Sequence, residues 1–423
     1  MPTVCGTKRR AWQVNAETGA PCAGPSPGPG PARPTLIALG WGSVAGVVTA
    51  MVYAGMMAVQ ELVWSVSDAR WYIPVAILVG GCLIAAMRRY SAEADLDGQI
   101  KEASDPTHLH RRRVAVLAAG AIVAFGFGGA IGPEAGLLAV VAELSALVSL
   151  RIARSTREQR LIGQVGTSAA LAGVYGSPPG AAAFDDDALT PSKVPSLLAA
   201  GAGFLGFLIT LRLLGRQGTE LGIPPYHAGV GQLLAAVVPA LCAAVLALGY
   251  RKLRPWCTVR VQRLGSPPVQ TLVGTAILAV LATLVPAVRF SGHDQLHEIP
   301  DLVVAGSWVT LAVVAVLKLV ATAVSISSGW RGGDFFPLLF SGAAAGAACC
   351  VVLPGLEAST AMVAGAGAAT TIGLGRPVAA LLIVAVLVGG TMWGPLAVGV
   401  CTGIVLHRLA PGREPDSSSH PHR

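Results

Sequence analysis

Residues 126–136 read GFGGAIGPEAG and place one carboxylate, that of Glu134, within a run that is otherwise apolar. Pro133 directly precedes it, and proline suits the first turn of a helix because no amide donor is needed there. The stretch therefore predicts a helix that begins at about Glu134. The unpaired amides and the dipole of a helix start attract negative charge, so this site suits either the Glu134 carboxylate or a free anion.

The composition around this stretch is that of a membrane protein. The chain has 423 residues, of which 53% are hydrophobic and only 12% charged, whereas a soluble domain carries about 25% charged residues. Apolar runs recur along nearly the whole chain, and several reach the roughly 20 residues that span a bilayer. Aromatic residues make up only 5%, which disfavours a transmembrane barrel with aromatic girdles. We expect an all-α, polytopic protein embedded in a lipid bilayer.

Both ends of the chain differ from this apolar domain. Residues 1–34 contain PCAGPSPGPGPARP and no apolar signal-peptide core, which predicts a disordered tail. Residues 411–423 form a polar C-terminal tail, which leaves 35–410 as the transmembrane domain. The eight cysteines show no metal-binding spacing, and we expect no disulfide framework, metal or cofactor.

The net charge of +8 reflects clusters of basic residues between the apolar runs. By the positive-inside rule, these clusters face the cytoplasm. We therefore expect a multi-pass protein of the cell membrane with cytoplasmic N- and C-termini, and no nucleic-acid partner. The clusters are Lys8–Arg10, Arg88–Arg89, Arg111–Arg113, 151–160, 250–263 and His407–Arg408.

The charge pattern also predicts the depth of Glu134. Because Arg111–Arg113 and 151–160 both face the cytoplasm, the chain must cross outward and return between them, with residues 132–136 at the turn. An ionisable side chain at membrane depth costs about 3 kcal/mol or more and is usually functional. The alternative is a glutamate that only caps the returning helix.

The sequence then repeats this design. Residues 169–184 (AALAGVYGSPPGAAAF) resemble 367–382 (GAATTIGLGRPVAALL), and a glycine-led helix start precedes each, at 132–136 and at 333–337. Two elements in the same order suggest an internal duplication, with a first repeat at about 35–215 and a second at about 228–409. Paired halves whose broken helices point at a midplane site are a recurrent way to bind anions. The alternative is chance similarity among Gly/Ala-rich segments.

The second helix start lies in SGWRGGDFFP, residues 328–337. Its glycines let an ion approach the backbone, and the amides of Asp334 and Phe335 would point at it. The rings of Phe335 and Phe336 would restrict water, although an aromatic anchor at the membrane interface is the simpler reading. We predict an anion site formed by Gly132, Pro133, Gly333, Asp334, Phe335, Phe336 and Pro337.

The order GPEAG and then GxFxP resembles the CLC family of voltage-gated chloride channels and proton/chloride antiporters, in particular its bacterial ion-transport branch. The resemblance covers roughly 35–409 and implies an inverted repeat of broken intramembrane helices in a homodimer with one pathway per subunit. It also implies that Glu134 matches the family's external gating glutamate. That carboxylate occupies the outer anion site until protonation lets it swing away, and in antiporters the same proton crosses the membrane.

The chain departs from the family pattern in three places. The family's GSGIP serine–glycine pair aligns with Asp97-Gly98, where an aspartate would repel an anion unless protonated or turned aside. The family's C-terminal pore tyrosine has no clear match in TMWGPLAVG, residues 391–399. The antiporters' inner proton glutamate falls nearest Asp187, where an acidic helix cap is the alternative.

No HExxH, P-loop or GxSxG motif indicates an enzyme. We therefore expect a CLC-like protein that conducts or exchanges chloride or a similar small anion, with or without protons. A different ion, suggested by Asp97, is one alternative. A non-transporting membrane scaffold or sensor that retains the fold is the other.

Overall fold

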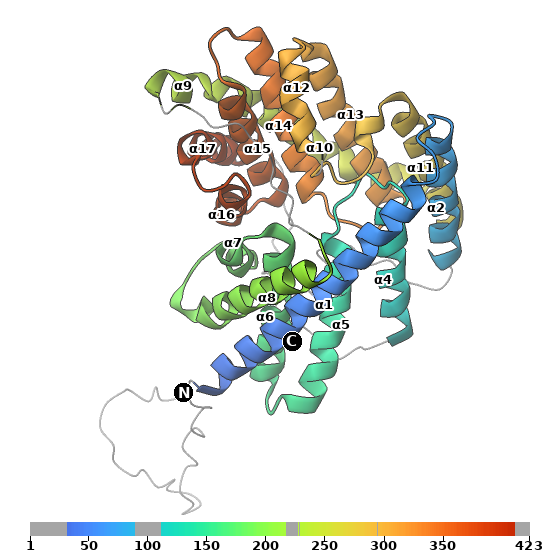
Figure 1. The fold of residues 1–423 in the computed structure, drawn as a ribbon, viewed down its shortest axis with the longest axis vertical. Helices are drawn as coiled ribbons and strands as arrows, with labels where there is room; N and C mark the ends of the chain where they lie inside the picture. The colour runs from blue at the N-terminus through green and yellow to red at the C-terminus, as the bar shows by residue number, and fades with distance from the viewer. Residues whose placement is uncertain (1–31, 89–110, 217–226, 228, 294, 411–423) are drawn as a thin grey trace, which may run out of the picture.

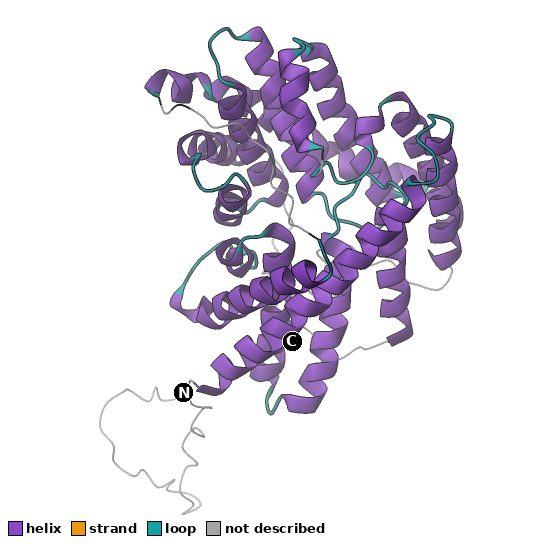
Figure 2. Cartoon of the chain, in the orientation of Figure 1, coloured by secondary structure: helices purple, strands orange, loops and turns teal. Residues whose placement is uncertain are grey.

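The computed structural model describes residues 32–88, 111–216, 227, 229–293 and 295–410. Most of the two predicted tails lies outside these residues, and so do Asp97 and Gly98. Within the described ranges the chain forms helices joined by loops, with no strand (Figure 2).

The first half of the chain contains α1 (Ala32–Trp64), α2 (Tyr72–Arg88), α4 (Arg111–Gly126), α5 (Glu134–Ile152), α6 (Thr156–Tyr175), α7 (Pro178–Ala183), a 3₁₀ turn (Pro191–Lys193) and α8 (Val194–Leu213). The second half contains α9 (Val230–Ala235), α10 (Val237–Gln262), α11 (Pro267–Leu284), 3₁₀ turns at Pro286–Val288 and Leu296–Glu298, α12 (Ile299–Val304), α13 (Trp308–Ser327), α14 (Phe335–Val352), α15 (Ala358–Leu374), α16 (Pro377–Leu387) and α17 (Trp393–Leu409).

Among the described residues, seven helical segments are long and apolar enough to cross a membrane; they contain α1, α5, α8, α10, α11, α13 and α14. Four more apolar helices are shorter, namely α2, α15, α16 and α17. The prediction of an all-α polytopic membrane protein is therefore confirmed.

The helices form two groups (Figure 1). In one, α1 packs against α6 and α8, and α5 packs against α6. In the other, α14 packs against α13 and α15, and α10 and α17 cover α15. The groups meet where α2 contacts α11 and where α7 contacts α16, so helices from both halves of the chain pack together at these two places.

The same helix–break–helix unit occurs in both groups. α6 ends because Gly176 adopts a left-handed conformation, with φ 66°, and α15 ends in the same way at Gly375, with φ 63°. Glycine terminates helices in this conformation because it has no Cβ to clash. Two residues later, Pro178 and Pro377 begin α7 and α16, which pack together. This symmetry supports the predicted duplication, while the repeat bounds stay a prediction.

Small residues allow the helix backbones to approach closely. A Cβ built on Gly46 of α1 would overlap the carbonyl of Gly203 in α8. A Cβ on Gly346 of α14 would overlap the carbonyl of Ala361 in α15 in the same way. Such contacts are typical of helix packing in membranes, where lipid removes most of the hydrophobic drive between helices.

Replacing Gly346 by valine is therefore expected to lower the free energy of unfolding by about 2–3 kcal/mol, because the new side chain must displace the backbone of α15. The measurement is the midpoint of thermal unfolding in detergent, followed by tryptophan fluorescence. Gly201→Ala in α8 is the matched control, because a Cβ there meets nothing within 4 Å. Equal midpoints for the two variants would contradict this account of the α14–α15 contact.

Candidate functional site

Two loops from the two helix groups are joined by a pair of backbone hydrogen bonds. The amide of Gly132 donates to the carbonyl of Gly333 at 2.8 Å, and the amide of Gly333 donates to the carbonyl of Gly132 at 3.0 Å. This isolated antiparallel bridge places the first residues of α5 and α14 side by side, since each helix begins two residues after its bridging glycine. The two predicted helix starts thus form one site.

Both helix starts leave amides available. α5 begins at Glu134 with Pro133 as its N-cap residue, one position earlier than the first-turn place predicted for this proline. Asp334 is the N-cap residue of α14, and neither N-cap side chain bonds a helix amide. The first amides of a helix have no intrahelical acceptor, and with the helix dipole they favour an anion.

The Glu134 carboxylate occupies this position. Its residue is 1% exposed, and neither of its oxygens has a hydrogen-bond partner among the described residues. The amides of Glu134, Gly333 and Phe336 face it without reaching hydrogen-bond geometry. A Cβ on Gly132 or on Gly333 would overlap the carboxylate, so glycine at both positions makes room for it.

Aromatic side chains surround the α14 side of the site. Phe335 and Phe336 are both buried, and their role in restricting water stays a prediction. The ring of Tyr175 lies 4.6 Å from that of Phe335, and the ring of His293 lies 5.0 Å from that of Phe336, between centroids. The sequence reasoning missed Tyr175 and His293. The position of Tyr175 directly before the break at Gly176 was the only local signal for it.

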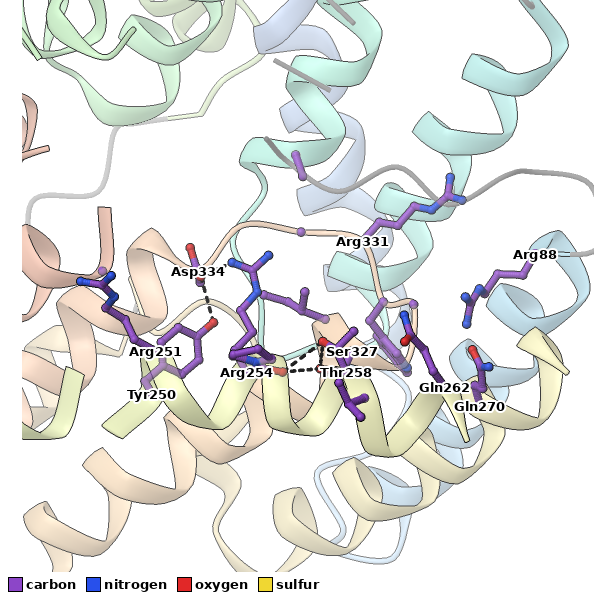
Figure 3. A pocket seen from close by; sticks show the side chains of 18 residues that line it. Arg88, Tyr250, Arg251, Arg254, Thr258, Gln262, Gln270, Ser327, Arg331 and Asp334 are labelled. Atoms are coloured by element: carbon purple, nitrogen blue, oxygen red, sulfur yellow. Dashed lines mark hydrogen bonds and ion pairs between the residues drawn. The ribbon is translucent and has the colours of Figure 1, made fainter. Parts of the chain in front are cut away.

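Asp334 contributes a helix start, but its side chain bonds α10. One carboxylate oxygen accepts a hydrogen bond from the Tyr250 hydroxyl at 2.9 Å and forms an ion pair with Arg254 at 3.2 Å (Figure 3). The adjacent guanidinium offsets the charge that this aspartate brings close to an anion site. Only the backbone amide of Asp334 is therefore available for the predicted binding of an anion.

A cavity of about 640 Å³ reaches the site from the α10 side (Figure 3). Its lining includes Ala135 in the first turn of α5, together with Gly332 and Asp334 beside the start of α14. Among the described lining residues, Asp334 is the single carboxylate, and the arginines are Arg88, Arg251, Arg254 and Arg331. Positive charge in a cleft concentrates anions and repels cations.

Comparison with known proteins places this geometry in a family. The family model described as voltage gated chloride channel matches residues 76–408. The chain belongs to the CLC family. It is 26% identical over 337 residues to the ion-transport protein YfeO of Salmonella newport (strain SL254), covering 72% of this chain and 78% of that protein, and the YfeO of Salmonella typhimurium matches equally well.

Solved CLC structures share the fold. A CLC-type fluoride/proton antiporter matches with a TM-score of 0.70 and 18% identity, covering 89% of this chain and 96% of the other. A slow cyanobacterial Cl⁻/H⁺ antiporter matches with a TM-score of 0.72 and 16% identity, covering 88% and 95%. The likeness establishes the CLC fold, and the chain is a multi-pass membrane protein of an ion-transport family.

The remaining predicted pathway residues lie elsewhere in this CLC chain. Asp187 Oδ1 accepts the amide hydrogen of Ala379, in the first turn of α16, at 2.9 Å. A carboxylate that accepts a hydrogen bond from the start of a helix acts as a helix cap, which is the alternative considered for Asp187. A pathway role for Asp187 stays a prediction. Asp97 and Gly98 fall outside the described residues. Within the described ranges, no three His, Cys, Asp or Glu side chains are grouped as metal ligands.

A buried lysine holds the loop that follows α11 over the site. Lys318 of α13 is 0% exposed, and its Nζ donates to the carbonyls of Ala287 at 3.1 Å and Arg289 at 2.7 Å. The loop that begins with these residues continues to Ser291 and His293, which border a cavity of about 30 Å³ beside Pro133 and Phe336. Lys318 therefore fixes the segment that closes the site on this side.

Lys318→Met keeps the length of the side chain and removes the donors to both carbonyls. We expect it to lower the free energy of unfolding by about 2–5 kcal/mol, because two partly buried carbonyl acceptors lose the donor they share. The check is thermal unfolding in detergent, with the exposed Lys252→Met of α10 as control. Unchanged stability in Lys318→Met would show that water or other donors satisfy these carbonyls.

Proposed function

We propose that this CLC chain moves chloride or a similar small anion across the cell membrane, with Glu134 as the gate. One observation carries the proposal. A fully buried carboxylate without a hydrogen-bond partner among the described residues lies between two helix starts that a backbone bridge holds together. Burial of an unsatisfied ionisable group is costly, and such groups persist where they serve transport.

The chemistry of the site favours an anion over a cation. Helix starts present amide hydrogens and the positive end of the dipole, which a cation avoids. The cavity that reaches them carries arginines from α2, α10 and the loop before α14. This supports a small anion over the alternative of a cation such as potassium, and fluoride belongs to the same class as chloride.

Each predicted anion-binding residue has a structural reason for its role. Gly132 and Gly333 leave room for the anion and bridge the two loops. The amides of Asp334, Phe335 and Phe336 are the unpaired donors of α14. Pro133 and Pro337 carry no amide hydrogen and stabilise the helix starts instead.

The gate works by competition for one position. The ionised Glu134 carboxylate occupies the place that suits an anion, so the pathway is closed. A proton on the carboxylate removes its charge and thereby its attraction to the helix starts, so the side chain leaves and an anion enters. If the Glu134 carboxylic acid releases this proton on the side of the membrane opposite to the one it came from, anion and proton movement are coupled. If the proton returns to the side it came from, the protein is a channel.

The assembly and orientation follow from the resemblance and the charge pattern. We propose a homodimer in the cell membrane, with one pathway per subunit and with both termini on the cytoplasmic side. The two repeats, at about 35–215 and 228–409, each supply one helix start to the site. A scaffold or sensor that retained the fold would not need the Glu134 carboxylate.

Glu134→Ala tests the gate. In proteoliposomes that contain wild-type protein, we expect chloride flux that depends on pH, and in Glu134→Ala we expect flux that no longer depends on pH, because the titrating competitor is gone. Internal pH is recorded in parallel. Proton movement that disappears in the variant identifies an antiporter, and its absence in the wild type identifies a channel. Glu143→Gln, on the same helix, is the matched control.

Two outcomes would contradict the proposal. Potassium flux without chloride, fluoride or nitrate flux would overturn the anion assignment and make Asp97 the residue to pursue. The absence of flux of any ion from folded, purified protein would favour the scaffold.

The arginine-lined cavity gives a separate prediction. Arg331→Gln is expected to reduce the rate of anion flux roughly two- to fivefold at low salt, since one unit charge near the pathway changes the local potential by about 0.5–1 kcal/mol. The reduction should shrink at high ionic strength, which screens the charge. Arg263→Gln, at the exposed end of α10, is the control. A reduction that is independent of salt would mean that the variant perturbs structure and not potential.

A further inference from the structure

Tyr175 is a buried polar residue that the gating mechanism leaves unused. It is the last residue of α6, directly before the left-handed Gly176 that ends the helix, and it is 1% exposed. The backbone of this helix end therefore fixes where the ring can lie.

The ring lies against the anion site. Its centroid is 4.6 Å from that of Phe335 and 5.8 Å from that of Phe336, the first two residues of α14. On its other side it contacts Phe184, at 6.1 Å. The charged groups that act on it are the carboxylates of Glu134 and Asp334 and, in the opposite sense, the guanidinium of Arg376.

The Tyr175 hydroxyl has no hydrogen-bond partner among the described residues. Other tyrosines of this chain do: the Tyr72 hydroxyl donates to the carbonyl of Val63 at 2.6 Å, and that of Tyr250 donates to Asp334. The Tyr175 hydroxyl is therefore free to donate to a ligand.

The same site holds acceptors without donors, since both Glu134 carboxylate oxygens lack a partner among the described residues. A hydroxyl donor and an anionic acceptor, each unsatisfied, thus lie around one buried turn of α14. An anion that enters as the Glu134 side chain leaves would meet helix amides on one side and the phenol on the other. The phenol would then gain the acceptor that it lacks.

We propose that the Tyr175 hydroxyl donates a hydrogen bond to the transported anion beside the Glu134 gate and so contributes to anion affinity and selectivity. The inference rests on the proposed function, because it needs an anion in this site. A hydrogen bond to a charged acceptor is stronger than one between neutral groups. The hydroxyl therefore favours anions that accept hydrogen bonds well.

Tyr175→Phe removes the hydroxyl and keeps the ring that packs on Phe335. We expect the half-saturating chloride concentration for flux in proteoliposomes to rise about 10-fold, which corresponds to one hydrogen bond to a charged group. The maximal rate should change less, and selectivity among fluoride, chloride and nitrate should narrow. Tyr72→Phe, which removes a hydroxyl at the first residue of α2, is the control and should match the wild type.

A second substitution keeps the shape of the side chain. Site-specific 3-fluorotyrosine at position 175 makes the hydroxyl a stronger donor and should lower the half-saturating concentration, at a pH where it stays protonated. If either variant shows wild-type affinity and selectivity, the inference is wrong, while pH-dependent wild-type flux that requires Glu134 still supports the proposed function. If the wild type carries no anion, both are wrong.

Discussion

The backbone bridge between Gly132 and Gly333 is the contact on which the rest of the site depends. Two hydrogen bonds join the start of α5 to the start of α14, and these helices belong to different halves of the chain. Glycine is required at both positions because the space that a Cβ would fill is taken by the Glu134 carboxylate. One local pairing thus sets the distance between two helix dipoles and the room that the Glu134 carboxylate has between them.

The bridge also explains how a carboxylate persists in an apolar interior. Glu134 has no cationic partner among the described residues, and the unpaired amides of two helix starts are the groups that face it. Helix starts stabilise negative charge without a counter-ion, and in the proposed function the carboxylate shares this position with a free anion. A lysine or arginine in this place would hold the carboxylate permanently.

In the described part of the chain, basic side chains lie instead around the site and do not bond the Glu134 carboxylate. Arg254 offsets the charge of Asp334, and other arginines line the cavity that leads to the first turn of α5. Lys318 holds the loop that carries His293 against Phe336. In the proposed function, this charge guides an anion toward the site, and the amide hydrogens bind it only where the helices begin.

The sequence by itself determined the fold class and both helix starts. Apolar runs, glycine breaks and basic clusters depend on local chemistry, so they predicted a polytopic helical protein, the start of α5 at Glu134 and that of α14 near Phe335. The repeated helix breaks at Gly176 and Gly375 could be predicted for the same reason. The tertiary structure decided what lies around those starts. Tyr175, His293 and Arg254 reach the site from α6, the loop after α11 and α10, and no sequence period relates them to Glu134. It also decided that the side chains of Asp334 and Asp187 bond α10 and α16, because only packing between distant helices sets which partner a carboxylate meets.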